Sequence, residues 1–319
     1  MRMTLGVLGR RVGAKVSPDV SARTVDGLAV PANAGPTHLT FMLPRGARFD
    51  ELRNTRAAAV MCDAQAGLKQ FVVDDVLLAC ARLCAWLPPV ADCSDQNACA
   101  DLIDENVEIH PSATIGSGAR IGSGSRVGAQ TYIESGAVIG NHCDIGANVV
   151  IRAPVSVGER CYIGSGCNLG EDGFGFIRDG HRWVRLPNFG DVRIGDDARI
   201  LAHSVIHRGV FSTTQVGRRC VIDSHVLIGH DARIGDDTAI AGHSAVAGAA
   251  VVGKECKIGG KVGIADGVYV ADGITVTGMS MVARSLDVPN SRYSSGWPAE
   301  LSNHWWRRVA GFKRLLGGQ

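Results

Sequence analysis

The segment Ile115-Gly-Ser-Gly-Ala-Arg-Ile121-Gly-Ser-Gly-Ser-Arg-Val127-Gly-Ala-Gln-Thr-Tyr-Ile133 decides the fold of this 319-residue chain. An aliphatic residue recurs at every sixth position, and a small residue follows each of the first three. A period of six fits neither a helix face nor simple strand alternation. It is typical of a left-handed parallel β-helix, in which each hexad forms one side of a triangular coil. The aliphatic residue then points inward, and the small neighbour is expected to let the chain turn the corner tightly.

The same period covers more than half of the chain. One long run extends over residues 109–169, a short run over 194–206 and a second long run over 216–282. Between these runs the spacing is broken, so loops are expected to leave the coil at 170–193 and 207–215. In a rigid solenoid, excursions of this kind are where binding groups are mounted.

The hexad pattern divides the chain into three parts. Residues 1–100 carry no hexads and indicate a small α/β domain, with a helix that begins after Asp75. Residues 107–285 are expected to form the mainly β part, the left-handed β-helix, and residues 286–319 a helical tail. Parallel sheets favour burial of both faces, so we expect a homotrimer with clefts between its subunits.

Composition limits the function classes. The net charge of +2 gives no reason to expect a nucleic-acid partner. The ten cysteines include no C-x-x-C pair and no zinc-site spacing, which favours reduced structural thiols in a cytosolic protein without a metal or organic cofactor. Neither a signal peptide nor a stretch of the ~20 apolar residues needed to cross a bilayer is evident, so a cytoplasmic protein without stable membrane insertion is expected.

Two histidines in the second long run are candidates for chemistry. His230 and His243 are 13 residues apart, which places them on different coils and adjacent sides. Each is either a general base, for which a neutral imidazole is well suited, or a polar residue at the surface or an interface. Asp223 or Asp231 would orient the ring, unless they are ordinary surface acids, and a backbone N–H at a glycine corner would stabilise a developing oxyanion.

The first excursion contains two phenylalanines between glycines. Phe174 and Phe176 either anchor this loop against the coil or contact a ligand. The glycine spacing is not the G-x-G-x-x-G of a dinucleotide-binding turn, so that function is rejected.

Motifs between the hexads are more specific than the hexads themselves. In their order along the chain they resemble the UDP-3-O-(3-hydroxyacyl)glucosamine N-acyltransferase family of lipid A biosynthesis. The motifs are Leu39-Thr-Phe-Met42, Asp172-Gly-Phe-Gly-Phe176, Val221-Ile-Asp-Ser-His-Val-Leu-Ile-Gly-His230, Val276-Thr-Gly-Met-Ser-Met281 and Tyr293-Ser-Ser-Gly296.

The resemblance implies a reaction and its catalytic residues. A 3-hydroxyacyl group would pass from acyl carrier protein to the 2-amino group of a UDP-3-O-acylglucosamine. His230 matches the family's catalytic base, Asp223 the aspartate that supports it, and Gly248 the glycine whose N–H serves as oxyanion donor.

The resemblance also implies what each part of the chain does: residues 1–100 would recognise the nucleotide sugar, residues 107–285 would hold the catalytic site, and the tail at 286–319 would bind the carrier protein. Phe41, Phe174 and Phe176 fall in regions that line the nucleotide-sugar and lipid pocket, and Met281 falls near the end of the acyl tunnel. Four cations of the tail match the part of the family that engages the acidic carrier protein, a steering use of charge. They are Arg307, Arg308, Lys313 and Arg314.

Some positions depart from the family pattern. Leu43 and Pro44 stand where the family has an Asn that helps to read uracil, and His207 in Ile206-His-Arg-Gly209 replaces an acid. Two alternatives therefore stay open: an N-acyltransferase for a different nucleotide-linked amino sugar, and a non-catalytic β-helix scaffold.

Overall fold

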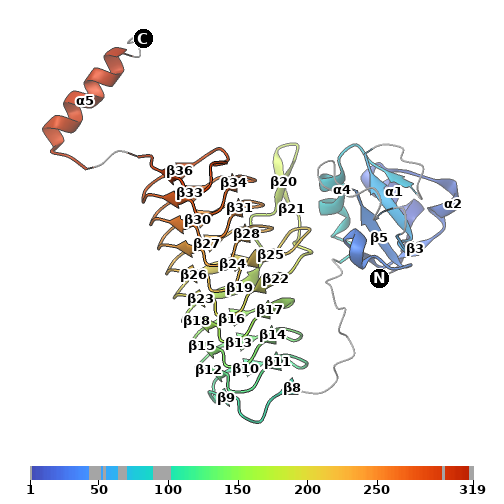
Figure 1. The fold of residues 1–319 in the computed structure, drawn as a ribbon. Coiled ribbons are helices and arrows are strands. Elements are labelled where there is room, and N and C mark those ends of the chain that lie inside the picture. The colour runs from blue at the N-terminus through green and yellow to red at the C-terminus, as the bar shows by residue number, and fades with distance from the viewer. Residues whose placement is uncertain are drawn as a thin grey trace.

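The computed structural model describes residues 2–42, 52, 55–63, 70–88, 102–296 and 299–315. Most of them form a tall three-sided coil, with a small α/β domain beside one flank and a helix that extends away from its end (Figure 1). Leu43 and Pro44 lie outside the described residues. The prediction of a mainly β chain, built as a left-handed parallel β-helix with an N-terminal α/β part and a C-terminal helix, is confirmed.

Three parallel sheets form the sides of the coil. Over the described residues they contain nine, nine and ten strands. The first sheet consists of β10 (Thr114–Ile115), β13 (Tyr132–Ile133), β16 (Val150–Ile151), β19 (Asn168–Glu171), β24 (Val205–His207), β27 (Leu227–Ile228), β30 (Ala245–Val246), β33 (Gly263–Ile264) and β36 (Met281–Val282). The second consists of β8 (Leu102–Ile103), β11 (Arg120–Ile121), β14 (Val138–Ile139), β17 (Val155–Val157), β22 (Val192–Ile194), β25 (Thr214–Val216), β28 (Arg233–Ile234), β31 (Val251–Val252) and β34 (Tyr269–Val270). The third consists of β9 (Glu108–Ile109), β12 (Arg126–Val127), β15 (Asp144–Ile145), β18 (Tyr162–Ile163), β23 (Arg199–Ile200), β26 (Val221–Ile222), β29 (Ala239–Ile240), β32 (Lys257–Ile258), β35 (Thr275–Val276) and β37 (Arg292–Tyr293).

The inward residues of the hexads stack in columns. In the regular part of the coil, paired residues are three hexads apart, as in Ile121 with Ile139. The column resumes after both breaks, because Leu169 pairs with Ile206 and Ile206 pairs with Ile228. The inward residues form one continuous buried core along the axis, so the period of six is the period of core burial.

A small residue follows the inward residue for a different reason from the tight turn that the sequence suggested. At Gly128 an added Cβ would lie 2.6 Å from the carbonyl carbon of Gly146 in the next coil. Such a distance is too short for any side chain, so the small residue is required by coil stacking rather than by the turn. The residue with positive φ comes two positions later in the corner, as at Asn148 (φ 56°).

At the corners, buried thiols and hydroxyls donate hydrogen bonds to the backbone of the next coil. The Thr131 hydroxyl donates to the carbonyl oxygen of Gly146 at 2.7 Å. The Cys143 thiol donates in the same way to Gly158 at 3.1 Å, and the Cys220 thiol to Gly235 at 3.1 Å. The cysteines within the described residues are free, and those of the coil therefore take the place of Ser or Thr.

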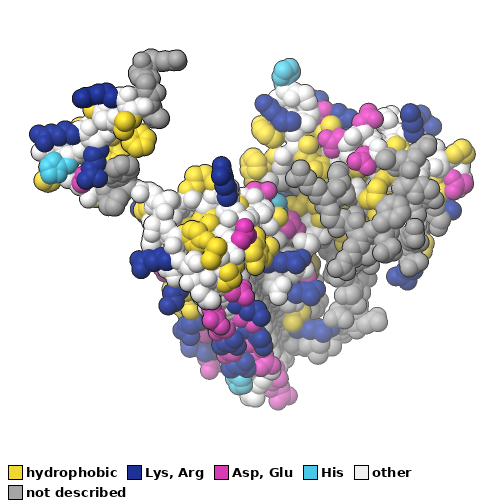
Figure 2. Space-filling model, turned by 45° about the horizontal axis from the view of Figure 1, so that its top comes forward, with side chains coloured by type: hydrophobic (Ala, Val, Ile, Leu, Met, Phe, Trp, Pro, Cys, Tyr) yellow, Lys and Arg dark blue, Asp and Glu magenta, His cyan; other side chains and the backbone are white. Residues whose placement is uncertain are grey.

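Charged side chains are interleaved over the solenoid surface (Figure 2). At the corner between the second and third sheets, Arg160 pairs with Asp197 at 2.8 Å and Arg219 with Asp237 at 2.6 Å. Single exposed pairs of this kind contribute little to stability, because solvent screens their charges. These ion pairs favour the observed stacking of the coils, but they are not its main cause.

The N-terminal part forms a five-stranded sheet in the order β2-β7-β6-β5-β4. The Asp75 carboxylate accepts a hydrogen bond from Leu78 N at 2.9 Å and caps the following helix, as expected. The elements are β1 (Met3–Thr4), α1 (Leu5–Val12), β2 (Lys15–Val16), α2 (Pro18–Ser21), β3 (Thr24–Val25), β4 (Gly27–Leu28), η1 (Pro31–Asn33), β5 (His38–Phe41), β6 (Ala59–Cys62), β7 (Gln70–Val72) and α4 (Val76–Leu83). The limits of the three domains stay a prediction.

Two elements project from the coil. The hairpin of β20 (Phe176–Asp179) and β21 (Arg182–Arg185) lies in the first excursion and contacts α4, where Arg82 pairs with Asp179 at 2.6 Å. The helix α5 (Ser302–Leu315) extends away from the solenoid (Figure 1). No helix within the described residues is long and apolar enough to span a membrane.

The core columns generate a stability prediction. In β32, Ile258 is buried and its neighbour Lys257 is exposed. Ile258→Ala is expected to lower the free energy of unfolding by about 2–5 kcal/mol, because the neighbouring coils cannot collapse into the cavity. Lys257→Ala is expected to change it by no more than about 0.5 kcal/mol. Denaturant unfolding at fixed protein concentration measures both, and equal losses would contradict the assigned inward direction.

Candidate active site

Both excursions and His230 lie at one corner, between the first and second sheets. The first excursion leaves after β19 and the second after β24, and the turn Gly229-His230-Asp231 follows β27. These three strands are consecutive neighbours in the first sheet. Segments from distant parts of the sequence are therefore stacked at this corner.

The His230 ring is held by the adjacent carboxylate. Its Nδ1 lies 2.9 Å from Oδ2 of Asp231, and the side chain is one-quarter exposed. This hydrogen bond raises the pKa of His230 above the ordinary value, against the lowering effect of partial burial. Because Nδ1 donates to Asp231, the neutral ring carries its lone pair on Nε2, the atom available to accept a proton.

Asp231 also fastens the second excursion to the coil. Its carboxylate accepts hydrogen bonds from the backbone N–H groups of Val210 at 3.0 Å and Ser212 at 2.8 Å. The Phe211 N–H at 3.3 Å and the Ser212 hydroxyl at 2.7 Å add to them. Burial alone would raise the pKa of Asp231, but these hydrogen bonds and the one from His230 lower it. The carboxylate is therefore charged at neutral pH and fixed in place.

Gly248 stands against the free edge of the His230 ring. A Cβ added to Gly248 would lie 2.5 Å from Cε1 and 2.6 Å from Nε2 of His230. Throughout the part of the chain that the structure describes, the Gly248 N–H finds no hydrogen-bond acceptor. An unpaired N–H beside the proton-accepting nitrogen is the geometry expected of an oxyanion donor.

Asp223 lies at a different corner of the same chain. It follows β26, between the third and first sheets, and accepts hydrogen bonds from Ser224 N at 2.7 Å and Gly242 N at 2.9 Å. Within one chain the carboxylate that supports His230 is thus Asp231. A contact between Asp223 and His230 would require a second subunit, and it stays a prediction.

His243 belongs to a stack of three imidazoles at that other corner. The rings of His203 and His225 are 5.2 Å apart and those of His225 and His243 4.9 Å apart, all nearly parallel. Each is the third residue after an inward one, with φ close to +60°. Within one chain His243 is therefore a stacked corner residue on the far side of the first sheet from His230.

The predicted binding residues differ in accessibility. Phe174 is 75% exposed and Phe176 43% exposed, and with Trp183 they form an aromatic cluster on the hairpin. Phe41 is 1% exposed, because its ring packs against Phe189 and Phe211 with centroids 5.7 and 4.9 Å away. Phe41 therefore packs against both excursions, and neither face of its ring is accessible to a ligand.

Met281 lies on the outer face of the first sheet. It is 72% exposed and stands in one column with Gly263, Ala245 and Leu227, which precedes His230 by three residues. Three coil steps of about 4.8 Å separate Leu227 from Met281, a span of about 14 Å. Between Leu227 and Met281 this column contains only the small residues Ala245 and Gly263.

The predicted carrier-protein residues lie on α5. Arg308 pairs with Glu300 at 3.1 Å, and all four cations lie in an element with no buried residues. They are Arg307, Arg308, Lys313 and Arg314.

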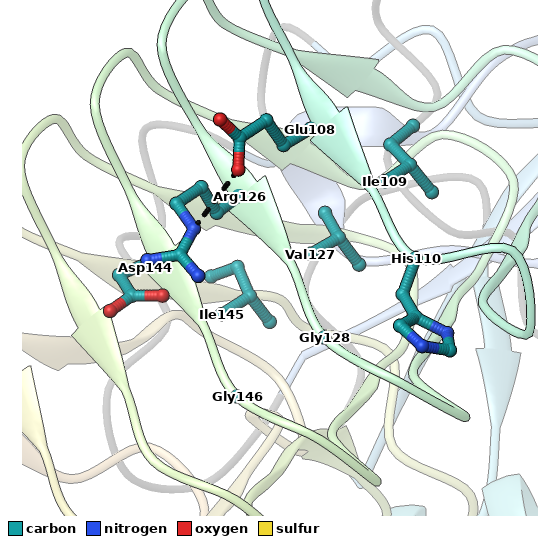
Figure 3. Close-up of a pocket in the computed structure, with 9 residues that line it drawn as sticks. All are labelled: Glu108, Ile109, His110, Arg126, Val127, Gly128, Asp144, Ile145 and Gly146. Carbon is teal, nitrogen blue, oxygen red and sulfur yellow. Dashed lines mark ion pairs between the residues drawn. The ribbon is translucent and has the colours of Figure 1, made fainter.

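A concavity elsewhere on the coil is lined by residues 108–110, 126–128 and 144–146, and not by His230. It has a volume of about 540 Å³ and crosses β9, β12 and β15 (Figure 3), which belong to the third sheet, several coils before the turn that carries His230. Glu108 and Arg126 in it are paired with each other at 3.3 Å. No group of three or more His, Cys, Asp or Glu residues is placed to hold a metal within the described ranges.

Known proteins resemble this chain over nearly its whole length. A family model described as "Bacterial transferase hexapeptide (six repeats)" matches residues 118–153 and 136–171. A UDP-3-O-acylglucosamine N-acyltransferase of Chromohalobacter salexigens is 42% identical over 98% of this chain and 92% of its own. The protein of the same name from Pseudomonas syringae pv. tomato is 34% identical over 98% of this chain and 91% of its own.

The chain belongs to the UDP-3-O-acylglucosamine N-acyltransferase family. It is therefore an acyltransferase, and the family predicted from its motifs is confirmed. Among solved structures, UDP-N-acetylglucosamine O-acyltransferase from Moraxella catarrhalis is similar, with a TM-score of 0.43 and 26% identity over 65% of this chain and 77% of that one.

The sequence identified most of the residues at this corner but not the contacts that hold them in place. It named His230 and Gly248, and it offered Asp231 as one of two orienting acids. It did not foresee that Asp231 would also anchor residues 210–212. No sequence signal marks these contacts, since backbone N–H groups are present at every non-proline position.

The His230–Asp231 pair generates a titration prediction. Because the Asp231 carboxylate raises the pKa of His230, Asp231→Asn is expected to lower that pKa. Activity that depends on neutral His230 should then persist to lower pH, although its maximum rate falls because the ring loses its orientation. NMR titration of the His230 Cε1–H signal measures the change, with the exposed Asp144→Asn as the control. A comparable fall in Asp223→Asn would place Asp223 beside His230 in the assembled protein, and no fall in Asp231→Asn would contradict the pairing.

Proposed function

We propose that this protein transfers a 3-hydroxyacyl group from acyl carrier protein to the 2-amino group of UDP-3-O-acylglucosamine, in lipid A biosynthesis. The names of its relatives supply the class of acceptor. The single observation that carries the proposal is the His230–Asp231 pair, whose free ring edge faces Gly248. A nucleotide sugar and an acyl carrier protein as substrates would place the reaction in the cytoplasm.

The corner offers what N-acylation by a thioester requires. As the amine nitrogen attacks the thioester carbonyl carbon, a C–N bond forms and the nitrogen must lose a proton, which Nε2 of His230 accepts. Asp231 stabilises the resulting imidazolium through its hydrogen bond to Nδ1. The carbonyl oxygen becomes an oxyanion that the Gly248 N–H can bind. When the C–S bond breaks, the imidazolium returns the proton to the leaving thiolate.

Three surfaces are suited to the substrates. The column from Leu227 to Met281 would take the acyl chain, and the exposed Phe174 and Phe176 would contact the sugar nucleotide or its lipid. The cations of α5 would engage the acidic carrier protein by electrostatic steering. A homotrimer would complete the site, because the outer faces of parallel sheets favour burial and Asp223 could then approach His230 from a second subunit.

A different nucleotide-linked amino sugar is the second candidate acceptor. The observation that favours it is His207, an imidazole beside the catalytic corner where the family pattern has an acid. A non-catalytic scaffold is the third candidate, and it predicts no dependence of any activity on His230.

Removing the imidazole tests the proposed reaction directly. Wild-type protein is expected to acylate UDP-3-O-acylglucosamine with at least one member of a panel of 3-hydroxyacyl carrier proteins. His230→Ala is expected to lower kcat about 10²–10⁴-fold with little change in the donor KM, because a general base acts in the chemical step. The exposed His142→Ala, at another corner, is the matched control and should keep the wild-type rate.

The same assay separates the candidates. Product from wild type that His230→Ala also forms at full rate would refute the assigned base. No product from folded wild type with any donor would redirect the search to other amino-sugar nucleotides, and failure there too would favour the scaffold.

Met281 is expected to limit acyl-chain length. Its long side chain follows the small residues Ala245 and Gly263 in the column of the first sheet, so Met281→Ala should shift the preferred donor toward longer acyl chains. Competition between carrier proteins of different chain length measures the shift. Met279→Ala changes an equally exposed methionine at the neighbouring corner and should leave the preference as it is. An unchanged preference in Met281→Ala would remove Met281 from the acyl site.

A further inference from the structure

Asp266 lies in the same column as His230 and Gly248. Each of the three is the second residue after an inward residue of the first sheet, and they belong to successive coils. Gly248 is the middle member of the column. Because it has no side chain, a space is left between the imidazole on one side and the carboxylate on the other.

The His230 ring and the Asp266 carboxylate both border this space. A Cβ added to Gly248 would lie 2.6 Å from Nε2 of His230 and 2.9 Å from Oδ1 of Asp266. The two atoms are therefore at most about 5.5 Å apart, the sum of these distances. Two hydrogen bonds of ordinary length, each about 2.7–3.2 Å, bridge such a gap through a single atom. One nitrogen atom of a ligand can thus bond to both groups.

The Asp266 carboxylate has no bonded partner within the described residues. It is exposed, and it makes neither a hydrogen bond nor an ion pair there, although Arg284 is the next member of its column. Its charge acts on the imidazole across the space: the Asp231 hydrogen bond raises the pKa of His230 most, and Asp266 raises it further. The carboxylate is therefore close to the base and available to a ligand.

Aspartates at the equivalent position of another corner have a structural role that Asp266 lacks. Asp236 and Asp272 are also second residues after an inward one, in the second sheet. Asp236 accepts a hydrogen bond from Arg218 N and Asp272 from Lys254 N, each one coil earlier and each at 2.8 Å. The corresponding bond from the glycine N–H to Asp266 is not made. At this corner the N–H and the carboxylate thus both remain available to a ligand.

The hydrogen-bonding capacity of these groups divides the reacting atoms among them. The Gly248 N–H can only donate, which suits the thioester oxygen, whereas a carboxylate accepts, which suits a group that carries N–H. In the proposed reaction that group is the amine of the acceptor. Its nitrogen becomes positively charged as it attacks the carbonyl carbon and stays so until His230 takes the proton. A carboxylate beside the nitrogen stabilises that charge.

We propose that Asp266 binds the amino group of the acceptor and holds it beside Nε2 of His230. The inference rests on the proposed function, because it takes His230 as the general base and an amine as the nucleophile. It assigns two different roles to the two acids near the ring. Asp231 acts through the imidazole, whereas Asp266 contacts the substrate itself.

Removing the charge of Asp266 tests the proposal kinetically. Asp266→Asn is expected to lower kcat/KM for the acceptor about 10–100-fold with little change in the donor KM, because a hydrogen bond to a charged group is lost. Since the side chain is exposed and unpaired within the described residues, the thermal unfolding temperature should stay that of wild type. Asp144→Asn removes an exposed acid from the third sheet and is the matched control. Equal acceptor kcat/KM values in the two variants would overturn the proposal.

An acceptor without the amine shows whether the amine is the group that Asp266 contacts. In the 2-deoxy analogue of UDP-3-O-acylglucosamine, hydrogen replaces the amino group. Asp266→Asn should weaken the binding of the amino sugar about 10-fold or more and leave the binding of the deoxy analogue unchanged. Calorimetric titration in the absence of an acyl donor measures both. Equal losses for the two ligands, or no loss for either, would overturn the proposal.

The binding measurement needs no turnover, so the two levels of argument fail separately. Full acyl-transfer activity of His230→Ala would refute the base and the proposed function. An essential His230, together with binding losses in Asp266→Asn that do not depend on the amine, would refute this inference alone.

Discussion

The stacking of one coil on the next is the constraint on which the rest of the structure depends. Each inward residue packs on the one three hexads earlier, and the residue after it lies so close to the neighbouring coil that Gly128 has no room for a Cβ. Any residue is therefore a neighbour in space of the residue one coil away, in a fixed direction. This is why His230, Gly248 and Asp266 are aligned, although 18 residues separate each from the next.

Insertions are tolerated in such a coil only where the chain leaves and returns without displacing the columns. Both excursions satisfy this condition at the corner between the first and second sheets, since the inward column is continuous from Leu169 through Ile206 to Ile228. The excursions also bind each other, as Gly190 N donates to Gly209 O at 2.8 Å. The concentration of functional groups at one corner thus follows from the topology, because irregular backbone can gather there without opening the core.

The sequence was sufficient to predict the features that follow from the six-residue period. It was insufficient to predict the contacts that depend on the paths of the loops. The hexads predicted the inward columns and the two breaks, because core burial repeats with every coil. They did not predict that Phe41 would be buried, since its partners Phe189 and Phe211 lie on excursions whose return path has no period. They left the choice between Asp223 and Asp231 open: within one chain the carboxylate that reaches His230 is that of Asp231, while the assignment of Asp223 stays a prediction. The stacked rings of His203, His225 and His243 were within reach of the sequence, because each is the third residue after an inward one.

The His230 ring is held by two sets of contacts at once. The stacking of the coils fixes the turn that carries His230. From the side, Asp231 accepts hydrogen bonds from the backbone of residues 210–212, and Phe211 in that segment packs against Phe41 of the N-terminal sheet. Since the same carboxylate orients the His230 ring, a displacement of the N-terminal sheet relative to the coil would be transmitted to the imidazole through one side chain. The rigid solenoid therefore does not by itself determine the geometry of the His230 ring. The docked N-terminal part completes it, which gives a physical reason for the two parts to share the aromatic cluster of Phe41, Phe189 and Phe211.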